Sequence, residues 1–242
     1  MPPGGDSAYD GLQLTLNKRL ASGVQIQGSY VWAKVFDNNT THQDTFNPME
    51  DYAISSIDIH QRFVVSYIYQ LPLGRGRPLG GNMPKWEDTV IGGWQINGIT
   101  TLQGGQPLKV SGSNTLSTFN FQYLLANTNF QNPSYSGAVK NRLTKYFNTA
   151  DFSQPAAFTL GVGPAYNNHL RSPGLDSTDF SLFKEFHIVE RLQAQFRAEA
   201  FNVFNHPQFS SPNTTVTSSS FGQITGQANS PRQVQFGLKL LF

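Results

Sequence analysis

Between Gln233 and Lys239 the chain alternates between polar and apolar side chains without a break. Successive side chains of an extended strand point to opposite faces, so a period of two predicts a β-strand with one apolar face. The apolar positions of this last strand are Val234, Phe236, Leu238, Leu240 and Phe242.

Six further segments show the same alternation. They span residues 12–17, 24–32, 62–71, 94–102, 179–187 and 192–200. A turn at Ala21-Ser22-Gly23 joins the first two, and a short turn at Val189-Glu190-Arg191 joins the fifth and sixth. We therefore predict an all-β fold, an antiparallel meander of about seven long strands, each of about nine to eleven residues.

The connections between these strands alternate in length. Long polar loops are expected at about 36–57, 112–175 and 208–230, and the connections between them are shorter, although 72–88 is long for a turn. Long loops on one side and short turns on the other are typical of outer-membrane barrels. An odd strand count cannot complete an ordinary bacterial barrel, so we expect an open or partial segment of a large transmembrane β-barrel.

The composition supports β-strands and argues against membrane-spanning helices, nucleic-acid binding and disulfide-stabilised folds. Aromatic residues make up 13% of the chain, which favours strands, and no run approaches the ~20 apolar residues of a membrane-spanning helix. Basic residues are scattered and the net charge is +2, so we expect no nucleic-acid partner. The absence of cysteine excludes disulfides and thiolate metal sites.

Aromatic side chains gather near the ends of the expected strands. Rings of this kind suit the headgroup regions of a membrane, so we predict an aromatic girdle facing outer-membrane lipid. The predicted girdle residues are Tyr30, Trp32, Tyr67, Tyr69, Trp94 and Phe204.

Candidate catalytic residues are sparse. Asp58, His60 and Arg62 alternate and could form a catalytic or metal-binding row, but we favour a lumen-facing row that pairs internally. Arg197 and Glu199 are interpreted as a structural ion pair, and the other four histidines as isolated. Because phosphate-loop and nucleophile-elbow motifs are also absent, we expect no catalytic residue, cofactor or metal, and no enzyme activity.

Several runs of residues, in their order and spacing, resemble the Oar-like TonB-dependent receptors that are abundant in acidobacteria. The runs are Tyr9-Asp10-Gly11-Leu12-Gln13 with Lys18-Arg19, Gly28-Ser29-Tyr30-Val31-Trp32, Asp58-Ile59-His60-Gln61-Arg62-Phe63, Leu71-Pro72-Leu73-Gly74, Leu170-Arg171-Ser172-Pro173-Gly174, Arg197-Ala198-Glu199-Ala200-Phe201-Asn202-Val203-Phe204-Asn205-His206-Pro207, and the closing run from Pro231 to Phe242.

The resemblance implies a barrel of about 22 strands, closed by an N-terminal plug and energised by TonB, that takes up a large nutrient. Residues 1–242 are then expected to be the C-terminal part of the barrel in the outer membrane, a fragment without plug, TonB box or secretion signal. TonB would act only through the missing plug region. The last strand is expected to be recognised by the barrel-assembly machinery.

A soluble protein remains the alternative at this point. In this hypothesis the chain is a secreted β-sandwich that binds carbohydrate through the loop aromatics Tyr123, Tyr135 and Tyr166. The two hypotheses differ in burial, because a sandwich would pack Leu12, Val65, Leu238 and Phe242 against a second sheet. A barrel would point them outward.

Overall fold

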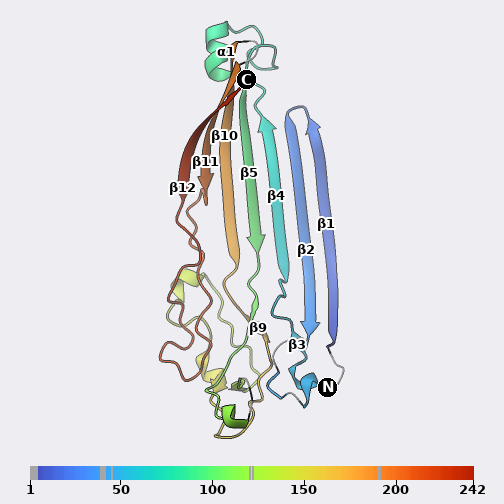
Figure 1. The fold of residues 1–242 in the computed structure, drawn as a ribbon, viewed down its shortest axis with the longest axis vertical. Helices are drawn as coiled ribbons and strands as arrows, with labels where there is room; N and C mark the ends of the chain where they lie inside the picture. Colours follow the sequence, from blue (N-terminus) through green and yellow to red (C-terminus); the bar gives the residue numbers. More distant parts are fainter. Residues whose placement is uncertain (1–4, 39–41, 45, 120, 122, 190–191) are drawn as a thin grey trace.

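A computed structural model describes residues 5–38, 42–44, 46–119, 121, 123–189 and 192–242. The molecule has two parts, a tall sheet and a body of packed loops below it (Figure 1). The short connections lie at the upper end of the sheet, and we call the lower part, formed by the three long connections, the loop body.

The sheet is an antiparallel meander in which the long strands neighbour one another in chain order. This confirms the predicted fold class, although three strands are longer than expected, at 14 or 15 residues. The predicted turn at 190–191 lies outside the described residues. The long strands are β1 (Ser7–Ala21), β2 (Val24–Asp37), β4 (Gln61–Gln70), β5 (Trp94–Gln103), β10 (Leu175–Val189), β11 (Leu192–Phe201) and β12 (Gln233–Leu241).

Strand register gives the sheet one apolar face. Tyr69 lies opposite Ile96, Ile96 opposite Leu182, and the same row continues through Ala198 to Phe236. Because side chains alternate along each strand, every second residue from this row shares its face. We call it the convex face.

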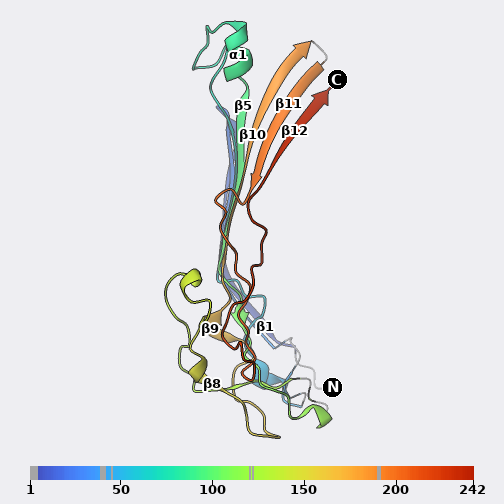
Figure 2. The ribbon, with the colours of Figure 1, turned by 90° about the vertical axis from the view of Figure 1, so that its left-hand side faces the viewer.

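The residues one position away form a polar row on the opposite face. Ile68 lies opposite Asn97, and the row continues through Ser181 and Glu199 to Gln235. A pocket opens on this face, and Figure 2 shows β10, β11 and β12 bending away from β5. We call it the concave face.

The convex face is uncovered. Leu12 is 47% exposed and Leu238 is 70% exposed, Phe242 is fully exposed and Val65 is half-buried. Figure 2 shows the long strands as a single layer, and the other two sheets among the described residues have only two short strands each. The packing that a sandwich requires is therefore not formed.

The loop body is folded, which the lack of periodicity in 112–175 did not predict. Its core combines Leu108 and Leu170 with Phe147 and Ile224, so two long connections pack together. The loop ranges also need correction, because β2 extends to Asp37 and β10 begins at Leu175. The short elements at this end are β3 (Ala53–Ile54), β6 (Pro107–Leu108), β7 (Asn127–Thr128), β8 (Phe152–Ser153), β9 (Asn167–Arg171), η1 (Pro48–Asp51), η2 (Ser117–Phe119), η3 (Val139–Asn141) and η4 (Thr149–Asp151).

The connection between β4 and β5 contains α1 (Lys85–Ile91), a helix that the sequence pattern did not predict. It lies at the end of the sheet opposite the loop body (Figure 1). Within the described part of the chain, no helix is both long enough and apolar enough to cross a membrane.

The two faces predict losses of stability of different size when a positive charge is introduced at adjacent positions. Val65 lies on the convex face and Ser66 on the concave face, both near the middle of β4. We expect Val65→Arg to destabilise the protein in phospholipid vesicles by about 2–4 kcal/mol, because the cation would face hydrocarbon. Ser66→Arg, the matched control, should cost less. Urea unfolding would measure both, and equal losses would contradict the assignment of the faces.

Candidate functional site

The convex face carries aromatic rings toward both ends of the strands. Trp32 lies opposite Leu12 and Gln61 toward the loop body, while Tyr69 lies opposite Val24 toward the short connections. Such a two-ended distribution is what an interfacial girdle requires.

The remaining girdle candidates fit the same two groups. Tyr30 lies toward the same end of the strands as Trp32, whereas Tyr67 and Trp94 lie toward the same end as Tyr69. Tyr67 lies across Gly98, where an added Cβ would clash with its ring. Phe204 lies beyond the end of β11, and its side chain is exposed. The girdle role itself stays a prediction.

The concave face holds a pocket between β4, β5, β10 and β11. Ser66, Asn97, Asp179, Glu199 and Phe201 line it. The Nδ2 of Asn97 is buried without a hydrogen-bond partner, and one oxygen of Asp179 accepts from the backbone of Asn202 at 2.9 Å. The site therefore offers carboxylates, an amide and an aromatic ring to a polar or cationic ligand.

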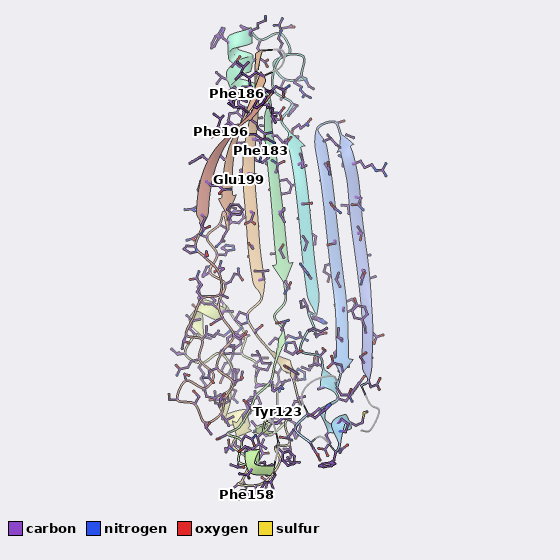
Figure 3. All side chains as sticks on the ribbon, in the orientation of Figure 1. Tyr123, Phe158, Phe183, Phe186, Phe196 and Glu199 are labelled. Carbon is purple, nitrogen blue, oxygen red and sulfur yellow. The ribbon has the colours of Figure 1, made fainter. Side chains whose placement is uncertain are left out.

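The predicted ion pair on this face is wrong. Arg197 donates from Nε to Gln195 at 2.7 Å, and its guanidinium lies 4.9 Å from the centroid of the Phe183 ring. Glu199 accepts a hydrogen bond from Gln235 instead. Figure 3 shows Glu199 on the strands, far from Tyr123 and Phe158 in the loop body. The carboxylate of Glu199 is thus not neutralised by Arg197.

The row of Asp58, His60 and Arg62 does not assemble into a catalytic site. Asp58 is fully buried and accepts from Arg171 at 2.7 Å and from the backbone of Val35 at 2.7 Å. His60 Nε2 accepts from the indole of Trp32 at 3.2 Å. Asp58 therefore pairs internally, as expected for a structural residue, and joins β2 to β9.

The tyrosines of the carbohydrate hypothesis have structural partners. The Lys109 ammonium lies 4.1 Å from the Tyr123 ring centroid and 5.1 Å from that of Tyr166. Tyr135 lies apart from them, with its backbone carbonyl accepting from Arg142. Two of the three aromatics thus form a cation–π site with a residue of the chain itself.

Burial shifts the titration of this cluster. Desolvation raises the pKa of Tyr123 strongly, and the nearby Asp51 carboxylate raises it further. Desolvation also lowers the pKa of Lys109, an effect that Asp51 opposes. The buried side chain of Gln43 adds hydrogen bonds to Leu125 at 2.7 Å and to Gly161 at 2.9 Å. A polar network therefore joins the first and second long connections.

Two histidines that were interpreted as isolated have acidic partners. His42 Nδ1 lies 3.3 Å from Asp51, and His206 Nδ1 lies 3.0 Å from Asp176. The second pair joins residues 30 positions apart in the printed sequence, at the start of β10 and beyond the end of β11. Because the two residues are far apart in the sequence, no short motif reveals the pair. Only the folded chain brings them together.

The comparison with protein families gives a match over nearly the whole chain. A family model described as an outer membrane beta barrel domain matches residues 1–235. The searches of curated proteins and of solved structures found no match.

The tyrosine cluster predicts a loss of loop-body stability at alkaline pH. A tyrosine whose pKa is raised by folding stabilises the folded state below pH 10.0, and this contribution is lost as pH rises through the folded pKa. Burial also raises the pKa of Tyr146, so we expect tyrosine ionisation above pH 10.0 that Tyr123→Phe reduces by the contribution of one tyrosine. Absorbance of tyrosinate would measure it, and an unchanged titration curve in the variant would refute the assignment.

The buried ion pair between Asp58 and Arg171 predicts a large loss of stability when the charge of Asp58 is removed. Asp58→Asn leaves Arg171 without its counter-charge, so we expect the loop body to lose about 3–5 kcal/mol. Asp176→Asn, which removes the exposed pair with His206, should cost less than about 1 kcal/mol. Hydrogen exchange of the β9 amides would report both, and similar protection in the two variants would contradict the structural role of Asp58.

Proposed function

The chain belongs to the family of outer membrane beta barrel domains, and on this premise we propose that it forms part of the wall of a TonB-dependent receptor for a large nutrient. The family places the protein in the bacterial outer membrane. Its convex face then contacts lipid, and its concave face borders the lumen.

The observation that carries this proposal is that the sheet remains open. β1 and β12 lie at its two edges, and each pairs with one long strand. An unpaired backbone group in hydrocarbon costs several kcal/mol, so both edges need partners in a membrane. Seven long strands with two open edges thus favour a barrel of more strands, and the widest outer-membrane transporters have plugged lumens.

The two ends of the sheet support an uptake role. The loop body covers the end with the long connections, which in such barrels faces the exterior. The concave pocket, with Asn97, Asp179 and Glu199, offers polar groups along the lumen. The resemblance of the runs at 9–13, 58–63 and 197–207 to Oar-like receptors supports the subtype.

The proposed role is transport and involves neither catalysis nor a cofactor. Asp58 and His60, the strongest catalytic candidates, have structural partners in Arg171 and Trp32. TonB would act through a plug within the lumen, and the nutrient would meet the loop body and the concave face. The plug is therefore the partner whose presence distinguishes this receptor from an open pore.

Crosslinking from the wall tests for that plug. A photoreactive amino acid at Ser181, on the concave face, should crosslink to a plug segment in cells that carry the receptor. The same probe at Leu182, the next residue on the convex face, should crosslink only to lipid. Two results together would refute the proposed subtype. They are the absence of a crosslinked plug peptide from position 181 and a conductance typical of an open pore.

The last strand is proposed as the signal for the barrel-assembly machinery. Val234, Phe236, Leu238 and Leu240 are exposed in one row along the edge strand β12, and the side chain of Phe242 is fully exposed. An apolar edge of this kind is available for recognition before it pairs.

Replacing the terminal ring tests this assembly signal. We expect Phe242→Asp to reduce the yield of folded, heat-modifiable barrel in the outer membrane severalfold. Leu241→Asp, the same change at the neighbouring position on the concave face, should reduce it less. Equal yields from the wild type and Phe242→Asp would rule out a signal role for this residue.

A further inference from the structure

The connection between β4 and β5, residues 72–93, has an exposed apolar surface. Trp86 is 70% exposed and Val90 is 63% exposed, and they lie one helical turn apart on α1. Leu79 and Ile91 are also exposed in the same connection. Apolar side chains gathered in this way indicate a surface that contacts something other than water.

This connection is fixed to the convex face by hydrogen bonds. The indole Nε1 of Trp94 donates to the carbonyl of Val90 at 3.0 Å, and the Lys184 ammonium donates to the carbonyl of Gly92. A further bond, from the backbone of Arg75 to Asp88 at 2.6 Å, holds the preceding turn against α1. The apolar surface of α1 is therefore attached to the sheet.

Lys184 indicates how deep in the membrane the connection is attached to the sheet. Its side chain belongs to the convex face, opposite Trp94, yet only 3% of it is exposed. The ammonium lies 5.3 Å from the Trp94 ring centroid and 5.0 Å from that of Phe186. A lysine on a lipid-facing surface is tolerated near the interface, where its charge reaches polar groups. Gly92 supplies such a group.

The position of α1 extends the lipid-facing surface. Figure 2 shows α1 on the side away from the bend of β10, β11 and β12, which is the convex side. Figure 3 shows Phe186 and Phe196 near the same end of the strands. β10 continues to Val189 beyond Lys184, so α1 accompanies the part of β10 that has no partner residues in β5.

We propose that residues 72–93 are an interfacial anchor that lies in the phospholipid headgroup region of the periplasmic leaflet. The surface is continuous with the convex face, which contacts lipid, and tryptophan favours this depth because its ring is apolar and its N–H is polar. Arg75, Arg77 and Lys85 supply cations from the same connection for lipid phosphates. The proposal rests on the outer-membrane placement and not on the receptor subtype.

The absence of native cysteine allows a direct test in the full chain. Trp86→Cys, labelled with a fluorophore, is folded into phosphatidylethanolamine–phosphatidylglycerol vesicles that contain brominated lipid. Ser136→Cys, an exposed position in the loop body, is the water-exposed control, and Leu238→Cys is the lipid-exposed control. We expect the label at position 86 to be quenched strongly by bromines near the headgroup and weakly by bromines near the chain ends. The label at position 238 should be quenched more by the deep bromines.

Two other results would overturn the anchor. If the label at position 238 is quenched but the label at position 86 is quenched no more than that at position 136, the connection lies in water. The barrel placement would then stand without the anchor. If the label at position 238 also escapes quenching, the convex face does not contact lipid, and both the anchor and the barrel wall are wrong.

Discussion

The structure depends on the need of every backbone amide in hydrocarbon for a hydrogen-bond partner. Antiparallel pairing between neighbouring long strands meets this need within the sheet. The same pairing fixes the register, so the row from Tyr69 to Phe236 faces one side and the row from Ile68 to Gln235 the other. At the outer edges of β1 and β12 the requirement is unmet, and this leads to the inference of a wider barrel.

The loop body is held together by burial and by charge. Phe147 and Leu124 are fully buried there, and Asp58 and Arg171 form a salt bridge across 113 positions of the chain. Because these interactions join segments that are distant in sequence, the loop body can keep a fixed shape at the mouth of the lumen. In the proposed receptor, a surface of fixed shape would lower the ordering entropy lost when a ligand binds.

The strands could be predicted because their signal is local. Val234, Phe236 and Leu238 show a period of two in the sequence, and short turns between such segments indicated that neighbouring strands pair. The loop body could not be predicted, since Gln43 bonds to Gly161 only after the chain folds. The helix α1 is seven residues long, too short for its periodicity to be recognised.

The central claim is that the convex face contacts lipid and the concave face contacts the aqueous lumen. Spin labels placed singly along residues 61–70 of β4, in the outer membrane, test it most directly. The account predicts that collisions with oxygen peak at Phe63, Val65, Tyr67 and Tyr69, and that collisions with a water-soluble nickel chelate peak at the residues between them. Accessibility that is uniform along β4, or that alternates in the opposite phase, would contradict the account.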